Sequence, residues 1–369
     1  MKHIHTGTGL DVGRIGLGCM GMSAFYDGAG QDEAESIRTL HRAVDQGVTL
    51  FDTAEAYGPF TNERLVGSAL KDRRDDVVIA TKFGLLKHAP GKDAEDYERG
   101  MDSSPAGIRI AVEASLQRLG TDRIDVLYQH RVDPAVPIEE TVGAMKEPVD
   151  EGKVLHLGLS EAGPDTIRRR TPCTRSRCCR ASTRSGPATP RAPCSTCCAS
   201  LGIGLVAYSP LGRGFLTGAI SSVADLSEAD YRSSSPRFAE EAFAQNMRIV
   251  DAVKDVAGEL DATPAQVALA WILAQGDDIA VIPGTKRVSR LDENVAADAV
   301  TLSADQLARP RRCPRRSATA TRTWVPSGAD PLGMSAGPVA STAGPADHRA
   351  HEEFAQISSE PVPPGRTRT

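Results

Sequence analysis

The sequence contains no run approaching the roughly eighteen consecutive apolar residues that a membrane-spanning helix needs. Its N-terminus, which begins Met1-Lys2-His3-Ile4-His5, lacks the apolar core of a signal peptide. The net charge of −5 gives no reason to expect a nucleic acid as a partner. We therefore expect a cytoplasmic protein that binds small molecules and neither a membrane nor a nucleic acid.

A second absence is local. Residues 170–199 contain no Asp or Glu and no Ile, Leu, Val, Met, Phe, Tyr or Trp. They consist of Arg, Pro, Ala, Thr, Ser, Gly and Cys, a composition typical of a GC-rich coding sequence read out of frame. A genuine insertion rich in Arg and Cys is the alternative. Six of the eight cysteines lie here, so the cysteines indicate neither a disulfide framework nor a metal site.

The same stretch is predicted to be unable to form a central strand of a sheet. Its four prolines remove hydrogen-bond donors from a strand ladder, and its arginines would be buried with no acid in the segment to pair with. A similar change of composition follows Leu307, where Arg309 to Arg316 interrupts a predicted helix. We therefore expect a folded domain over residues 1–307 and a disordered tail, also typical of a shifted frame, over residues 308–369.

Outside these stretches, strand-like and helix-like segments alternate. Short apolar runs suited to strands buried on both faces occur at 15–18, 48–53, 77–82, 124–128, 154–159, 201–208 and 279–282. Amphipathic segments separate them; Gly47 and Gly152 are predicted helix stops, and Thr263 is a predicted N-cap. Repeated β-α units predict an α/β fold with a parallel sheet, and the length suits a (β/α)8 barrel. Seven strands are found, and the missing sixth strand should fall within residues 170–199.

Four polar residues fall near the ends of these predicted strands: Asp52, Tyr57, Lys82 and His130. Because the carboxyl ends of all strands open on one face of a parallel barrel, the four side chains can converge there. A carbonyl group that accepts a hydride needs a proton at its oxygen. A tyrosine, with its ordinary pKa of about 10, can supply that proton if a nearby cation stabilises the phenolate.

In this interpretation Lys82 is the cation, Asp52 holds it charged and oriented, and His130 hydrogen-bonds the carbonyl oxygen. Taken singly, each residue has a plain structural explanation as well. A histidine at a strand end is more often structural, and a lysine there is usually solvated. No Gly-x-Gly-x-x-Gly sequence is found between a predicted strand and the helix after it, which argues against a Rossmann dinucleotide site.

Several motifs occur in the order found in the aldo-keto reductase superfamily, and the chain resembles that family over roughly residues 1–169 and 201–307. Gly-Leu-Ser-Glu-Ala at 158–162 resembles a branch of bacterial and plant reductases. The matching segments are Gly16–Ser23, Phe51–Gly58 with Asn62-Glu63, Ile79–Gly84, Asp125–Arg131, Gly158–Ala162, Ala207–Gly214 and Ile282–Lys286.

The resemblance implies a (β/α)8 barrel that reduces aldehydes or ketones with NADPH. It places Asp52, Tyr57, Lys82 and His130 on the family's catalytic tetrad, with Tyr57 as the proton donor. No metal is implied. The positions implied to bind the cofactor are Met20, Gly21, Ser160, Tyr208, Ser209, Leu211, Gly212, Lys286, Arg287, Arg290, Glu293 and Asn294. Among these, Lys286, Arg287 and Arg290 correspond to the family residues that bind the adenosine 2′-phosphate. A solvated basic turn is the plainer explanation.

Two departures from the family pattern bear on function. The family's sixth strand carries a Gln that holds the nicotinamide amide, and no residue here matches it. Glu161 stands where many members have Asn. Two alternatives to an active reductase stay open: a barrel that binds cofactor but acts on a partner protein, as potassium-channel β subunits do, and an inactive product of a damaged gene. The sequence does not indicate the physiological substrate or the oligomeric state.

Overall fold

Eight parallel strands form the central sheet of the fold. The computed structural model describes residues 1–6, 9–24, 26, 30, 32–88, 95–170, 178–182, 193–226, 230, 232–233, 238 and 240–310. The strands lie side by side in chain order and are parallel throughout. They are β3 (Leu17–Gly18), β4 (Leu50–Asp52), β5 (Val78–Phe83), β8 (Ile124–Gln129), β9 (Val154–Ser160), β10 (Cys178–Ser182), β11 (Gly204–Tyr208) and β12 (Ile279–Ile282).

The first and last strands of this sheet are joined to each other. Parallel bridges pair Ile15 with Val281 and Gly18 with Gly284. The amide of Gly16 donates to the carbonyl of Val281 at 2.8 Å, and the amide of Val281 donates to the carbonyl of Arg14 at 2.9 Å. The sheet therefore closes into the barrel that the sequence predicts.

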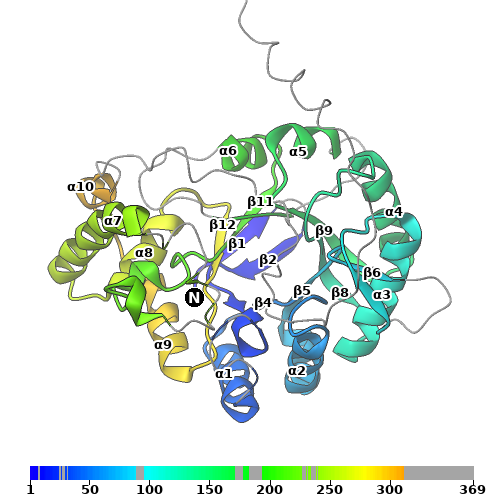
Figure 1. Cartoon of the computed structure of the whole chain (residues 1–369), viewed down its shortest axis with the longest axis horizontal. Coiled ribbons are helices and arrows are strands. Elements are labelled where there is room, and N and C mark those ends of the chain that lie inside the picture. Colours follow the sequence, from blue (N-terminus) through cyan, green and yellow to red (C-terminus); the bar gives the residue numbers. More distant parts are fainter. Residues whose placement is uncertain are drawn as a thin grey trace, which may run out of the picture. The chain divides into compact units, whose positions relative to one another are not determined.

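Helices surround the barrel as an outer ring (Figure 1). They are α1 (Glu33–Asp45), α2 (Thr61–Leu70), α3 (Pro105–Leu119), α4 (Ile138–Asp150), α5 (Pro164–Arg170), α6 (Pro193–Ser200), α7 (Glu240–Glu259), α8 (Pro264–Leu273), α9 (Val288–Ala296) and α10 (Ala304–Ala308). The predicted N-cap is confirmed, because the Thr263 hydroxyl accepts from the Gln266 amide and the Gln266 side chain accepts from the Thr263 amide. No helix of the described segments is both long and apolar enough to cross a membrane.

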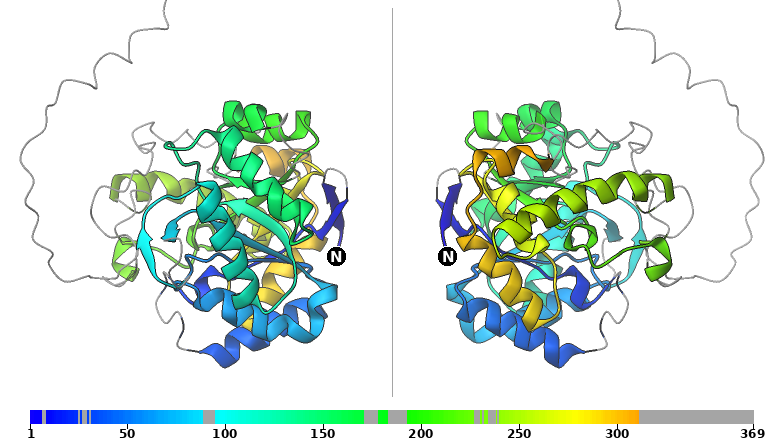
Figure 2. Two further views of the ribbon diagram at one scale, coloured as in Figure 1. Left: turned by 90° about the vertical axis from the view of Figure 1, so that its right-hand side faces the viewer. Right: turned by 90° about the vertical axis from the view of Figure 1, so that its left-hand side faces the viewer.

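An antiparallel hairpin closes the end of the barrel where the strands begin. It consists of β1 (His3–Thr6) and β2 (Leu10–Gly13), and its side chains Ile4, Leu10 and Val12 join the interior cluster of the barrel. A second hairpin, formed by β6 (Leu86–His88) and β7 (Tyr97–Arg99), follows β5 and lies toward the opposite end (Figure 2). Only the end at which the strands finish is thus left for a site.

The expectation that residues 170–199 could not supply a strand is wrong. Strand β10 occupies the sixth position, as its register shows: Cys178 pairs with Gly158 of β9 and with Gly204 of β11. A ladder is built from backbone N–H and C=O groups, which every residue except proline supplies in full. Residues 178–182 contain no proline, because all four prolines of the stretch lie outside them. The strand lies where the missing one was predicted, although its residues are neither large nor strongly apolar.

Helix α6 continues the same anomalous stretch. Two of its cysteines, Cys197 and Cys198, are buried in a cluster with Leu159, Ile167 and Ile203. A free cysteine behaves as a small hydrophobic residue, so it packs against the barrel here without large aliphatic side chains. The domain boundary at 307 and the tail from 308 stay predictions: the described residues end at 310, and residues 311–369 lie outside them.

The spacing Gly-x-Gly-x-x-Gly does occur at Gly16–Gly21, but in the wrong setting for a Rossmann site. It spans β3 and the 3-10 helix Met20–Met22, and the first α-helix begins only at Glu33. Gly16 has a packing role, since a Cβ atom there would lie 2.7 Å from the carbonyl oxygen of Leu50. The glycines therefore allow close approach of neighbouring strands.

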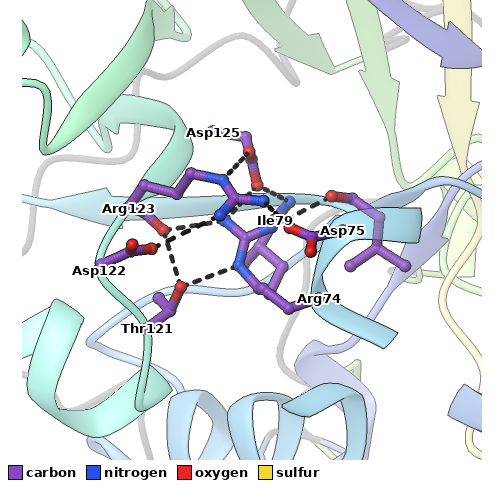
Figure 3. Close-up of polar contacts among 8 residues, drawn as sticks. Arg74, Asp75, Ile79, Thr121, Asp122, Arg123 and Asp125 are labelled. Carbon is purple, nitrogen blue, oxygen red and sulfur yellow. Dashed lines mark hydrogen bonds and ion pairs between the residues drawn. The ribbon is translucent and has the colours of Figure 1, made fainter. Parts of the chain in front are cut away.

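A polar network ties together the beginnings of β5 and β8 (Figure 3). Asp125 Oδ2 accepts from the backbone amide of Ile79 at 2.8 Å and pairs with Arg74 at 2.6 Å. Arg74 also donates to the Thr121 hydroxyl, and Arg123 pairs with Asp75. Because this end of a barrel carries stability rather than chemistry, the network is a structural clamp.

Candidate active site

The alternation of side chains along the strands brings three of the predicted residues to one place. Residues two apart on a strand point to the same face. Three side chains of β4, β5 and β8 lie in the interior cluster: Leu50, Ala80 and Tyr128. Two positions further along come Asp52, Lys82 and His130, which therefore also point inward, at the end where the strands finish. Their exposed fractions are 2%, 0% and 5%.

Lys82 is the centre of this group. Its Nζ donates to Asp52 Oδ1 at 2.8 Å and also to the backbone carbonyl of Thr53. The side chain is fully buried, and a buried ammonium is stable only when it is paired and hydrogen-bonded. Asp52 is thus the ion-pair partner of the buried Lys82 side chain.

Tyr57 reaches the group from the loop after β4. Its ring centroid lies 4.6 Å from Lys82 Nζ and 5.8 Å from the His130 ring, in an edge-on arrangement with 83° between the ring planes. The turn that follows depends on Gly58, which has φ +66° and whose Cβ, if present, would lie 2.3 Å from the Thr61 hydroxyl. All four predicted residues are therefore brought together in the structure.

A buried pair beside this group was not found from the sequence. Glu55, two residues before Tyr57, is fully buried; its Oε1 accepts from the Gly84 amide at 3.0 Å and its Oε2 lies 3.1 Å from His88 Nε2. Burial raises the pKa of the Glu55 carboxyl above its ordinary value. Glu55 thereby connects the loop that carries Tyr57 to the end of β5 and to β6.

Asn62, quoted above only as part of a motif, also supports the site. Its side-chain amide donates to the Cys19 carbonyl at 2.9 Å and to Ser23, and it accepts from the Thr53 hydroxyl at 2.7 Å. Asn62 therefore links the loop after β3 to the loop after β4. Burial raises the pKa of the Cys19 thiol, which disfavours its thiolate form.

Ser160 ends β9 and is fully buried. Its hydroxyl oxygen lies 3.3 Å from the Nη1 atom of Arg131, which also donates to the His130 carbonyl at 2.7 Å. Arg131 follows His130 directly and was assigned no role in the sequence analysis. It places a guanidinium at the same end of the barrel as the tetrad.

The remaining predicted cofactor residues lie at or after the ends of β3, β11 and β12. Met20 and Gly21 follow β3 in the 3-10 helix Met20–Met22, and Tyr208 ends β11. In the loop after Tyr208, Ser209 and Gly212 have φ values of +49° and +60°. The loop is therefore tightly folded, and Leu211 packs against the core beneath it.

The three cations lie where β12 leads into α9. Lys286 and Arg287 precede the helix, and Arg290 in its first turn pairs with Glu293 at 2.7 Å, with 57% of the arginine side chain exposed. The Val288 amide at the helix start donates to Glu35 of α1 at 3.1 Å. Asn294 is buried, with 4% exposed. The exposed guanidinium groups of Arg287 and Arg290 at a helix N-terminus fit a phosphate.

Comparison with known protein families agrees with this barrel and its cluster of polar side chains. A model of the aldo/keto reductase family matches residues 14–314. The chain belongs to the aldo/keto reductase family. A relative described as "Probable aldo-keto reductase 1" from Glycine max is 41% identical over 300 residues, which cover 81% of this chain and 84% of the relative. Family members are oxidoreductases, so the chain is an enzyme of that class by descent.

Solved aldo-keto reductases share the fold. The glycerol dehydrogenase AKR11B4 from Gluconobacter oxydans matches with a TM-score of 0.72 and 24% identity, over 86% of this chain and 98% of that one. The aldo-keto reductase AKR11C1 from Bacillus halodurans (holo form) matches with a TM-score of 0.68 and 27% identity, over 85% and 97%. An aldo/keto reductase from Klebsiella pneumoniae, in complex with NADP and acetate, matches with a TM-score of 0.66 and 23% identity, over 85% and 97%.

Proposed function

We propose that this aldo-keto reductase reduces aldehydes or ketones to alcohols with NADPH, and that Tyr57 donates the proton to the carbonyl oxygen. The observation that carries the proposal is the buried Lys82 ammonium, which lies between the Asp52 carboxylate at 2.8 Å and the Tyr57 ring at 4.6 Å. A cation held beside a phenol favours its phenolate form, so proton release from Tyr57 becomes easier.

Each of the other residues has a distinct task in this proposal. Asp52 keeps Lys82 charged, so that the lysine remains a cation when the phenol gives up its proton. His130, whose ring lies edge-on to Tyr57, hydrogen-bonds the carbonyl oxygen and directs it toward the phenol. Together they place one proton donor and one hydrogen-bonding group at a single oxygen atom, which is what carbonyl reduction requires.

The cofactor would be held by residues that follow four strands. Ser160 would contact the nicotinamide amide, Tyr208 to Gly212 would cover the nicotinamide ring and pyrophosphate, and Lys286, Arg287 and Arg290 would bind the 2′-phosphate. Glu293 and Asn294 would contact the adenine, and Met20 and Gly21 would line the cofactor site. NADPH, when bound, supplies the hydride. The exposed arginines Arg287 and Arg290 at the start of α9 support a cofactor with a 2′-phosphate.

The direct test follows NADPH oxidation by absorbance with the full chain and a series of aldehydes. Turnover with stoichiometric alcohol formation supports the proposal. Tight NADPH binding without turnover of any aldehyde or ketone would instead favour the alternative of a barrel that binds cofactor but acts on a partner protein. Loss of both binding and turnover would indicate the product of a damaged gene. A cytoplasmic location is part of the same proposal and is checked by cell fractionation.

A further inference from the structure

Arg131 stands out among the arginines that are partly buried. Four others each pair with a carboxylate: Arg14 with Asp298, Arg74 with Asp125, Arg118 with Glu63 and Arg232 with Asp230. Across the described segments of the chain, no carboxylate lies within ion-pair distance of Arg131. A guanidinium removed from water normally has a counter-ion, so this one is positioned to receive an anion from outside.

The neighbouring acid in sequence is already occupied. Asp133 Oδ2 accepts from the Ser103 amide at 3.1 Å, and its Oδ1 accepts from the Ala135 amide at 2.9 Å. Its carboxylate therefore stabilises the loop after β8 instead of the guanidinium. Lys82, the buried cation of the predicted tetrad, pairs with Asp52. The charge of Arg131 is thus left uncompensated beside the tetrad.

The hydrogen bonds of Arg131 fix its orientation and leave donors available. Only Nη1 is engaged, with the His130 carbonyl and the Ser160 hydroxyl. A guanidinium carries five N–H donors in one plane, and its Nε and Nη2 atoms have no recorded partner within the described residues. Two neighbouring donors in one plane match the two oxygens of a carboxylate.

We propose that Arg131 binds the carboxylate of the substrate, so that the preferred substrates are oxo acids: aldehydes or ketones that also carry a carboxylate. The inference rests on the proposed function, because the carbonyl end must lie at Tyr57 and His130. The Arg131 Nη1 atom lies 3.3 Å from the Ser160 hydroxyl at the end of β9, so the guanidinium lies at the same end of the barrel as His130. A charge-assisted bidentate contact of this kind changes affinity by about 10- to 100-fold.

The test uses the full chain with NADPH and two matched aldehydes, 4-carboxybenzaldehyde and its neutral isostere 4-carbamoylbenzaldehyde. The expected result is a kcat/KM at least tenfold higher for the carboxylate. Arg131→Gln should bring the ratio of the two values close to one, whereas Arg131→Lys should keep part of it because the charge remains. Arg309→Gln, which removes an arginine paired with Glu259 on the surface, should leave the ratio unchanged.

A binding readout accompanies the kinetics. Benzoate should bind the protein saturated with NADP⁺ more tightly than benzamide in calorimetry, and Arg131→Gln should remove the difference. Equal kcat/KM values for the two aldehydes in the unmodified protein would overturn the inference while leaving the proposed function intact. A loss of NADPH affinity in Arg131→Gln, with both aldehydes affected alike, would overturn it as well and assign Arg131 to the cofactor. No turnover of either aldehyde would contradict the proposed function, and benzoate binding alone would then decide the inference.

Discussion

The ammonium nitrogen of Lys82 lies 4.6 Å from the centroid of the Tyr57 ring, although the two residues are separated by 25 positions in the sequence. Lys82 is fixed by the end of β5 and by Asp52, while Tyr57 is fixed by the turn after β4. The distance between Lys82 Nζ and the Tyr57 ring therefore depends on two backbone segments that are held in place independently. In the proposed reaction, a proton donor whose activating cation is held this way needs little rearrangement to react.

The first prediction concerns Tyr57→Phe. The variant keeps the ring and its packing but has no proton to give, so carbonyl reduction should fall by about 10²- to 10⁴-fold. NADPH binding, followed by fluorescence titration, should change by less than about threefold, since none of the proposed cofactor contacts involves the phenol. Turnover equal to that of the unmodified protein would show that another group donates the proton.

The second prediction concerns cofactor preference. Arg290→Ala should weaken NADPH binding by about 10- to 100-fold and NADH binding far less, because only NADPH carries the 2′-phosphate. Arg168→Ala is a matched control: this arginine also pairs with an acid three positions away, Asp165, and has 60% of its side chain exposed. Similar losses for the two cofactors in Arg290→Ala would place the 2′-phosphate elsewhere.

The fold could be predicted from the sequence because most barrel strands are continuous apolar runs with helical segments between them. The run at 77–82 became β5 and the run at 154–159 became β9, each within one residue at either end. The count of strands placed the sixth strand within residues 170–199, but its bounds could not be predicted, since residues 178–182 show no apolar pattern. Its position is set by β9 and β11, which present two open backbone edges on either side of one gap.

The candidate site also contains some residues that the sequence predicts and others that it does not. Asp52, Lys82 and His130 could be predicted because they lie at or just after the ends of recognisable strands, and strand ends meet on one face of a barrel. The Glu55–His88 contact joins residues 33 positions apart and depends on the hairpin after β5, which no pattern in the sequence indicates. Arg131 could not be singled out either, because the lack of a nearby carboxylate is a property of the folded chain alone.

The third prediction concerns the clamp at the opposite end of the barrel. Asp125→Ala removes the acceptor of the Ile79 amide and the partner of Arg74, so the free energy of unfolding should fall by about 3 kcal/mol. Asp122→Ala is the control: its carboxylate is 86% exposed and lies 3.5 Å from Arg123, and the change should stay within about 0.5 kcal/mol. Urea denaturation measures both.

Asp125→Ala should also leave the KM values for NADPH and aldehyde unchanged at 25 °C, because the clamp lies away from the strand ends that carry the tetrad. A variant that loses substrate affinity while keeping its stability would contradict this division between the two ends of the barrel.

The fourth prediction follows from the raised pKa of Glu55. In the unfolded chain this carboxyl ionises near its ordinary pKa, whereas the folded protein holds the proton to higher pH. The contribution of Glu55 to stability is therefore full below the ordinary pKa and is lost as the pH rises through the raised one. Between the two pKa values the loss is about 1.4 kcal/mol per pH unit.

Glu55→Gln keeps an acceptor for the Gly84 amide but does not ionise, so it isolates this effect. The free energy of unfolding of the unmodified protein, minus that of Glu55→Gln, should decrease as the pH rises from 4 toward neutrality. Glu98→Gln, at an exposed position on β7, is the control and should show a constant difference. A constant difference for Glu55→Gln as well would mean that the His88 contact offsets the cost of burial.

The last prediction concerns β10. Because β9 and β11 flank β10 on both sides, the amides of residues 178–182 should exchange slowly with solvent in the full chain. Their protection should match that of residues 204–208 in β11 and should be lost in the same cooperative unfolding step. A version of the gene with the reading frame restored across 170–199 provides the comparison. Rapid exchange at 178–182 in the chain as written, together with slow exchange at those positions in the restored version, would show that the anomalous sequence cannot hold the sixth strand.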